Sequence, residues 1–328
     1  MADIIDPASR LAKLIARQEP AFAAGFQILV AQMKNQLDLG AIADLLASGR
    51  LEEALTTVMR AAPSVGNLYV NSFIAAANDS AAFLNKSVAG LVVDFDATNP
   101  FAVQVMREEK LRMIAEFTQK QRAATRQALL DGITQGNNPR QQARAFRDSI
   151  GLTDSQVRAV NNYKRMLAEG DRAVLDRALR DKRFDPSIKR AFDSGEPLTR
   201  TQMNKMVERY RERFIKHRSE VIARTEALRS VHQGKHNMYL QAIEAGELDP
   251  NTLENEWQTS LRPNVRDSHG AMHGQKVPFN AEFISGLGNR ALHPGGFGKA
   301  EEDIQCVCTV GTRITQIVAP AGISIEIL

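Results

Sequence analysis

The stretch "RYRERFIKHRSEVIARTEALRSVHQGKHNMYLQAIEAG", residues 209–246, decides the fold class of this chain. Apolar side chains such as Tyr210 and Phe214 recur in it three and four residues apart, which indicates an α-helix with one buried stripe. Thr199, with a glutamine three residues later, predicts a capping box at the start of the helix. We therefore expect one long helix over residues 199–246, with a break near Gly234.

The segments before this helix carry the same kind of signal. Aromatic residues make up only 6% of the chain, while alanine, leucine, arginine and glutamine are plentiful, and this balance favours helix over sheet. Asn99 and Asn138 each precede a proline, a pattern typical of an N-cap followed by a first-turn proline. The sequence therefore predicts an N-terminal helical region over residues 1–92 and a helical body over residues 93–245.

The composition and the hydrophobic pattern of the sequence change after Gly246. Trp257, the only tryptophan, lies in "NEWQTS", which alternates like a strand, and glycine and proline become dense between residues 263 and 298. The last twenty residues are rich in β-branched side chains. We expect a small C-terminal α+β module over residues 246–328. The predicted fold class is mainly α, a long helical body followed by this small C-terminal α+β module.

Composition narrows the class of protein. The chain of 328 residues has a net charge of +4 and a pI near 9.1, which permits contact with nucleic acid without requiring it. No signal peptide is apparent, and no apolar run approaches the roughly 18 residues that a membrane span needs. Two cysteines are too few for a disulfide framework. We expect synthesis in the cytoplasm and no membrane-spanning segment.

A basic run lies inside the long predicted helix. Nine lysine or arginine residues stand against four glutamates between Lys205 and Lys235. One interpretation is a solvated helix face with some ion pairs, and the other is a nucleic-acid or partner surface. The candidate nucleic-acid contacts are Arg209, Arg211, Arg213, Lys216 and Arg218.

Histidines and cysteines are paired in the predicted module. "PNVRDSHGAMHG" fits a short helix capped by Asn264 and closed by Gly274, and this helix would place its two histidines, four residues apart, on one face. In "QCVCTV", taken as a strand, both cysteines point to the same side. Two nitrogens and two sulfurs on converging elements suit a structural Zn²⁺ site. The candidate metal ligands are His269, His273, Cys306 and Cys308, with His293 as an alternative ligand.

Two other interpretations of this cluster stay open. The side chains could form a metal-free, hydrogen-bonded structural knot. They could also form the catalytic centre of a metal-dependent nuclease or transferase that uses Asp267, His269, His273 and Glu226, with a cysteine as a further candidate nucleophile. The chain has no glycine-rich phosphate loop, no HExxH and no GxSxG motif. We therefore predict that it is not an enzyme and has no catalytic residues.

The order of these motifs resembles a known family. "IARTEALRSVHQGKHNMYLQAIEAG", "WQTSLRPNVRDSHGAMHGQKVPF", "HPGGF" and "IQCVCT" together resemble the Mu F-like module of phage head morphogenesis proteins, from about Ile222 to Thr309. Two departures are Val307, where the family has arginine between its cysteines, and the placement of Arg262 and Arg266 ahead of an aspartate. The residues on the family's pattern are Arg224, Thr225, Glu226, Trp257, Asp267, His273, Gly274, Phe279, His293, Pro294, Cys306 and Cys308.

The resemblance implies a minor head protein of a tailed bacteriophage. Such proteins associate with the portal and the scaffolded shell, stay in the head in a few copies, and in some cases affect DNA packaging or exit. The implied partners are the portal protein, the major capsid or scaffolding protein and double-stranded DNA. The implied location is the virion, in the head interior or at the portal vertex. A DNA-binding protein ejected with the genome is the alternative.

Residues 1–90 show no family signal and contain no histidine or cysteine. We expect them to supply partner contacts rather than chemistry. On this interpretation the C-terminal module would fold without them.

Overall fold

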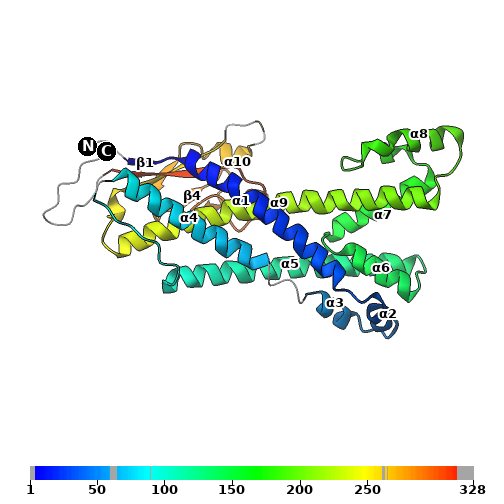
Figure 1. Ribbon diagram of the computed structural model, residues 1–328. Coiled ribbons are helices and arrows are strands. Elements are labelled where there is room, and N and C mark those ends of the chain that lie inside the picture. Colours follow the sequence, from blue (N-terminus) through cyan, green and yellow to red (C-terminus); the bar gives the residue numbers. More distant parts are fainter. Residues whose placement is uncertain (1–3, 60–64, 89, 261–262, 264, 316–328) are drawn as a thin grey trace. The chain divides into compact units, whose positions relative to one another are not determined.

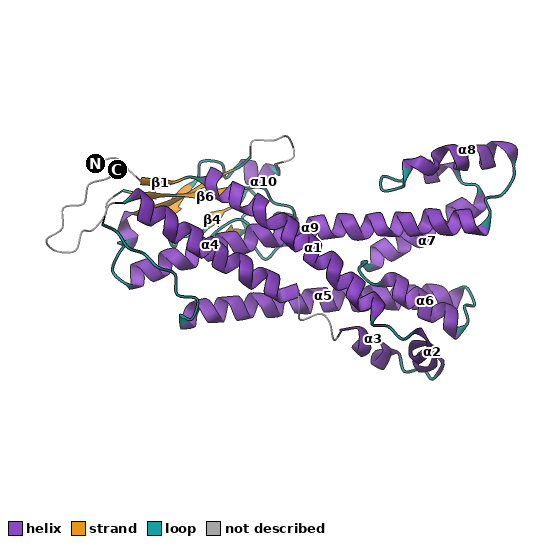
Figure 2. Cartoon of the chain, viewed as in Figure 1, coloured by secondary structure: helices purple, strands orange, loops and turns teal. Residues whose placement is uncertain are grey.

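A computed structural model describes residues 4–59, 65–88, 90–260, 263 and 265–315. It confirms the predicted fold class, because long helices make up most of the described chain and all of its strands except Ile4–Asp6 lie within residues 253–314 (Figure 2). None of the helices in the described part of the chain combines the length and the apolar character needed to cross a membrane.

The helices and strands follow one another in a simple order (Figure 1). The α-helices are α1 (Ala8–Asn35), α2 (Leu39–Ala47), α3 (Leu51–Met59), α4 (Val65–Ser87), α5 (Pro100–Thr134), α6 (Pro139–Ser149), α7 (Asp154–Glu169), α8 (Asp185–Ser194), α9 (Arg200–Glu244), α10 (Asp267–Gly270) and α11 (Ala300–Asp303). Short 3₁₀ turns lie at Arg172–Asp176, Lys182–Phe184 and Pro250–Thr252. The strands are β1 (Ile4–Asp6), β2 (Leu253–Gln258), β3 (Lys276–Pro278), β4 (Phe283–Ile284), β5 (Arg290–Ala291) and β6 (Thr309–Ile314).

The predicted helix caps are present. The Asn138 side chain accepts a hydrogen bond from the backbone of Gln141, whose own side chain returns one, and Thr153 and Gln156 do the same. Each exchange satisfies two backbone donors that a helix start would otherwise leave unpaired. Thr199 begins α9 in this way, and α9 then continues through Gly234 without the predicted break.

The chain forms two compact units, each built from separate stretches. One unit contains Met1–Ala24, Gly66–Leu111 and Glu220–Leu328, and the other contains Gly25–Val65 and Arg112–Ser219. Three of the unit boundaries fall inside α1, α5 and α9, so each of these helices contributes to both units. The segments 1–92, 93–245 and 246–328 stay a prediction.

The sheet lies in the first unit. Its strand order is β1-β6-β2-β3, and all three neighbouring pairs are antiparallel. β4 and β5 form a separate two-stranded ribbon. Figure 1 shows β1, at the blue end of the chain, beside the red strand β6.

Buried charges tie β1 to α9. The Asp6 carboxylate is fully buried, receives two hydrogen bonds from Arg10 at 2.7 and 2.8 Å, and lies 3.3 Å from Lys235 Nζ. Lys235 also donates to the carbonyl oxygen of Val310 in β6 at 3.2 Å. The N-terminal segment is therefore part of the core of the module's sheet. The expectation that residues 1–90 supply partner contacts rather than chemistry stays a prediction.

The helices of the first unit pack closely on one another. Tyr239 on α9 and Leu84 on α4 belong to one apolar cluster that also includes Ile314 of β6. At Gly234 the backbone of α9 comes so near to α4 that a Cβ there would clash with the carbonyl oxygen of Phe73. Glycine at 234 is therefore required by this helix contact and does not interrupt the helix.

The second unit is entirely helical in its described part. Its apolar cluster centres on Tyr163 of α7 and Tyr210 of α9, whose rings stack 4.2 Å apart. Helices α5, α6, α7 and α9 line a cavity of about 660 Å³ in this unit. Its wall mixes cationic, acidic and amide side chains, among them Arg144, Lys164, Arg200, Asp131 and Asn161.

Candidate functional site

The candidate site lies where β2 and β6 meet the two shortest helices of the module. Along β2 every second residue is buried, and this alternation turns Trp257 toward the interior. The register pairs Gln258 with Thr309, so the segment just before β6 runs past the end of β2. Cys306 and Cys308 lie in that segment. They precede β6 and are not part of it, contrary to the predicted strand.

Three of the predicted metal ligands converge there. His269 Nδ1 is 3.5 Å from Cys306 Sγ and 3.5 Å from Cys308 Sγ. The three ligand atoms all lie within 4.8 Å of one another. Each of the three side chains is 1% exposed, so the cluster is closed to solvent.

A buried carboxylate stands behind the imidazole. His269 Nε2 lies 2.9 Å from Glu302 Oε2, within ion-pair distance, although the ring N–H is not aligned with the oxygen as in a hydrogen bond. Glu302 is fully buried and accepts hydrogen bonds from Ser268 Oγ at 2.9 Å, Ser285 Oγ at 2.7 Å and Asn289 Nδ2 at 3.0 Å. The sequence interpretation missed Glu302, although "KAEEDIQC" places an acidic cluster directly before the cysteines.

The protonation of the cluster follows from these contacts. Burial raises the pKa of Glu302, but the three hydrogen bonds and the nearby imidazole outweigh it and lower the pKa overall. Burial alone would lower the pKa of His269, whereas Cys306 and Glu302 raise it above its usual value. The Cys306–Cys308 contact raises the pKa of Cys306 and lowers that of Cys308. One thiol of the pair is therefore the more readily ionised.

Aromatic rings pack against His269 in this cluster. Trp257 meets the His269 ring edge-on at 5.6 Å, Phe297 stacks on the His269 ring at 5.5 Å, and the Trp257 and Phe297 rings lie 5.8 Å from each other. Phe283 lies against Trp257 at 5.2 Å. The Trp257 Nε1 group is buried without an aligned acceptor, yet it is close enough to Cys308 to help lower the pKa of that thiol. The cluster is therefore buried between apolar rings and the hydrogen-bonded Glu302 carboxylate.

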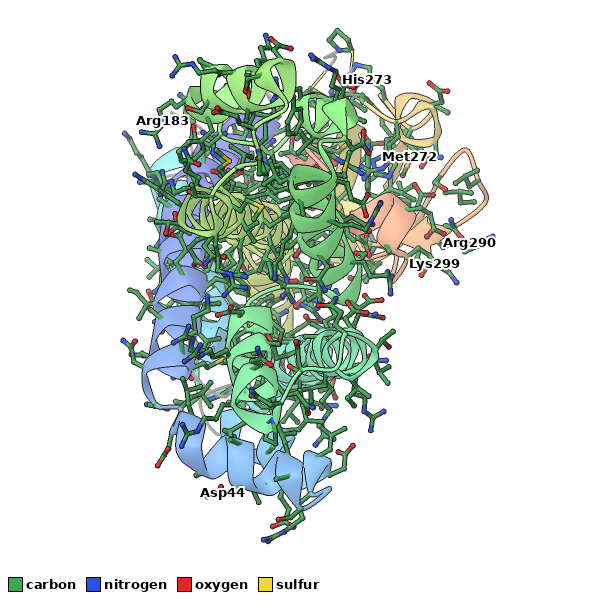
Figure 3. The ribbon with its side chains drawn as sticks, turned by 90° about the vertical axis from the view of Figure 1, so that its right-hand side faces the viewer. Asp44, Arg183, Met272, His273, Arg290 and Lys299 are labelled. Carbon is green, nitrogen blue, oxygen red and sulfur yellow. The ribbon has the colours of Figure 1, made fainter. Side chains whose placement is uncertain are left out.

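His273 does not join this cluster. Helix α10 ends at Gly270 after one turn, so the prediction that His269 and His273 share a helical face is wrong. His273 is exposed, and its Nδ1 accepts a hydrogen bond from the backbone of Thr259 at 3.2 Å. Figure 3 shows its side chain at the surface of the chain. The predicted cap Asn264 lies outside the described residues.

His293 belongs to a different buried cluster. Its ring stacks on His232 at 5.9 Å, and its Nδ1 lies 3.1 Å from the carbonyl oxygen of Pro294. Burial lowers the pKa of both histidines, so both are neutral. Beside them Asp303 binds Arg229 at 3.2 Å and accepts two backbone hydrogen bonds, from residues 297 and 298. This arrangement stabilises the loop that carries the His-Pro motif.

The side chains proposed for an enzymatic site lie in different surroundings. Asp267 and His273 are exposed, whereas His269 and Glu226 are buried. In the described structure these four side chains therefore do not line one accessible cleft.

The five candidate nucleic-acid contacts lie on α9 in the second unit. Arg209 pairs with Glu212, Arg211 lies 3.4 Å from Asp148, and Arg213 donates to the carbonyl oxygen of Arg180 at 3.1 Å. Lys216 is exposed, and Arg218 is only 6% exposed.

Arg218 is buried beside two aromatic rings that contact each other. Its guanidinium lies 5.3 Å from the Phe26 ring and 5.9 Å from the Phe117 ring, and Nη1 has no acceptor among the described residues. Burial lowers the pKa of Arg218 to about 10. Its side chain is therefore not accessible to a phosphate in this conformation.

A known protein family matches a stretch of the chain that includes the candidate site. Residues 182–311 match the family model described as phage Mu protein F like protein. The matched stretch is less than half of the chain, and it includes the residues that carry the resemblance seen in the sequence. The family suggests a phage head-related protein.

One curated relative is an NAD(+)--arginine ADP-ribosyltransferase EFV of Enterococcus faecalis. It is 33% identical over 88 residues, which are 27% of this chain and 17% of that protein. The chain therefore matches only a small part of that relative's length. No solved structure matches the chain.

Proposed function

We propose that this protein is a phage minor head protein that acts in head morphogenesis, at the portal vertex or on the interior of the capsid shell. The observation that carries the proposal is the family match over residues 182–311. The matched stretch includes His269, Cys306 and Cys308, so the buried cluster lies within the segment that the family model covers.

The closed geometry of the cluster supports a structural role for the module. A substrate could reach His269 or either cysteine only if the surrounding aromatic rings moved apart, because each of the three side chains is 1% exposed. A buried polar cluster of this kind stabilises a fold and leaves the outer surface free for binding. The module would then act through its surface, as a component of an assembly.

Helix α5 offers an apolar contact surface. Leu130 and Ile133 are 60% and 61% exposed, and their spacing of three residues places them on one face of the helix. Exposed apolar side chains that lie side by side often mark protein–protein contacts. We infer that this face contacts a head protein such as the portal or the shell protein.

Mass spectrometry of purified particles tests the proposal. We expect this protein in the heads at a fixed, low ratio to the portal protein, and defective heads when its gene is deleted. A Leu130→Ser/Ile133→Ser variant should fold but enter heads poorly, whereas Ile28→Ser, which changes an equally exposed side chain on α1, should enter normally. Particles that contain none of the wild-type protein would refute the proposal.

A transferase is a second candidate, because the enterococcal relative is named as an ADP-ribosyltransferase. The similarity spans only 17% of that protein, so the shared stretch can be a module that both proteins carry without shared chemistry. Incubation with labelled NAD⁺ and an arginine-rich acceptor protein should give no labelled product. Transfer above the level without protein would instead favour an enzyme.

An ejected DNA-binding protein is the remaining alternative. It depends on the basic face of α9, where Arg209, Arg211 and Arg213 already contact protein oxygens and Arg218 is buried. We expect duplex binding to be weak, with a shallow dependence on salt. Tight binding that falls about 10³-fold between 50 and 200 mM salt would indicate about six phosphate contacts and favour this alternative.

A further inference from the structure

We propose that His269, Cys306 and Cys308 bind one zinc ion that stabilises the C-terminal module, and that Glu302 positions His269 as a ligand. The proposal does not depend on the function in phage heads. It concerns a cluster that is closed to solvent and belongs wholly to the first unit.

The distances fit a zinc ion better than a hydrogen bond. At a tetrahedral angle, Zn–S bonds of about 2.3 Å and Zn–N bonds of about 2.0–2.1 Å give an N···S separation of about 3.5 Å. His269 Nδ1 lies 3.5 Å from each sulfur. An imidazole nitrogen carries a single proton or a single lone pair, so it can share a hydrogen bond well with only one sulfur. Equal separation from both sulfurs is what a common bound ion produces.

The contacts around the ligands also suit a metal. A histidine that binds a metal usually directs its other ring nitrogen to a carboxylate or a carbonyl group, which fixes the orientation of the ring. Here Nε2 faces Glu302, which is held in turn by two serines and an asparagine. Nδ1 is thereby left for the ion. The backbone N–H of Cys308 also donates to Cys306 Sγ at 3.4 Å, which orients that sulfur.

Zinc is the metal that this donor set favours. Thiolates select soft or borderline ions, and two thiolates with one imidazole are typical of zinc among the common divalent metals. In the described part of the chain these side chains form the only group of three or more histidine, cysteine or carboxylate residues close enough together to hold a metal. These three side chains would supply three of the four ligands of a tetrahedral zinc ion.

The position of the cluster explains what the ion would do. It would join α10, which has one turn, to the irregular segment before β6. Neither segment has enough regular structure to be stable alone, and the binding free energy of a metal adds directly to the free energy of folding.

Elemental analysis of the full-length protein tests the site. We expect one zinc per chain, lost in Cys306→Ser/Cys308→Ser and in His269→Asn, and retained in His273→Ala and His293→Asn. Glu302→Gln should weaken zinc binding by about 10–100-fold in competition with a chelating dye, whereas Glu301→Gln, at an exposed neighbouring position, should not. Retention of zinc in the double cysteine variant would refute the assignment.

A second measurement keeps the test decisive if the variants do not fold. Wild-type protein reconstituted with Co²⁺ should show thiolate-to-cobalt absorption and the strong visible bands of four-coordinate cobalt. Chelator should then release both thiols to a thiol reagent and lower the melting temperature. A metal-free wild type whose melting temperature is unchanged by chelator and by added zinc would overturn the proposal.

Discussion

Replacing Asp6 by asparagine should destabilise the first unit by about 3–5 kcal/mol. Asp6 is fully buried and is the carboxylate nearest to Lys235, whose side chain is itself buried. The substitution would leave Lys235 with the carbonyl oxygen of Val310, at 3.2 Å, as its main polar contact. Removing one partner of a buried ion pair costs about 3–5 kcal/mol, because the other charge stays buried without compensation.

Tryptophan fluorescence gives the assay. Trp257 is the only tryptophan, is fully buried and lies in β2 of the same sheet, so its emission reports the unfolding of that sheet. With a urea dependence of about 3 kcal/mol per M, the Asp6→Asn variant should shift the unfolding midpoint down by about 1 M or more. Asp79→Asn is the matched control. It also faces Arg10 but is 30% exposed, and should cost about 1 kcal/mol or less.

The pH dependence gives a second readout. Burial raises the pKa of Asp6, but Lys235 and Arg10 outweigh it and lower the pKa below 3.8. The pair therefore contributes stability above about pH 4, and that contribution is lost as the pH falls through the folded-state pKa. Asp6→Asn/Lys235→Met should regain most of the loss, because no charge is then left unpaired. The reasoning would be wrong if Asp6→Asn cost less than about 1 kcal/mol.

Three further outcomes follow from the fold and are checked by the same urea titration. Deleting β1 should lower the unfolding midpoint at least as much as Asp6→Asn, and an unchanged midpoint would show that the sheet does not need this strand. Gly234→Ala should cost about 1–3 kcal/mol, because its Cβ would clash with Phe73, whereas Gly270→Ala, with open space around it, should be neutral or slightly stabilising. Burial lowers the pKa of His236 to about 3, so the unfolded state takes up a proton first and stability should fall by about 1.4 kcal/mol per pH unit below about pH 6.5. His232 and His293 are buried with lowered pKa values and add to this slope, so His236→Gln should reduce it by about 1.4 kcal/mol per pH unit, whereas His217→Gln, at an exposed position, should leave it unchanged.

Local signals in the sequence predicted the helices well. The caps at Asn99, Asn138 and Thr199 depend on side chains that bond to backbone groups two or three residues away, so the sequence contains the whole interaction. The continuity of α9 at Gly234 could not be predicted in this way. It depends on a close contact with α4, whose residues lie far away in the chain.

The sequence predicted only part of the candidate site, because the site also depends on contacts between residues far apart in the chain. Both histidines fit one helical pattern, but only His269 lies beside Glu302 and the cysteines, which are more than thirty residues further on. His273, unlike His269, is on the family's pattern, yet α10 ends before reaching it. The pairing of β1 with β6 could not be predicted from the sequence either, because a strand of three residues is too short to show an alternating pattern.

The pairing of Ile4–Asp6 with residues near the other end of the described chain sets an order of events during synthesis. The first strand to leave the ribosome cannot pair until Thr309–Ile314 has followed it, roughly three hundred residues later. Until then Asp6 has no sheet to enter, and Lys235 on α9 has no buried counter-ion. Contacts between such distant residues form late, because a long loop must close first. In a chain that stopped before β6, β1 and β2 would lack the strand that joins them in this sheet. We expect the unpaired backbone of these strands to be accessible to proteases.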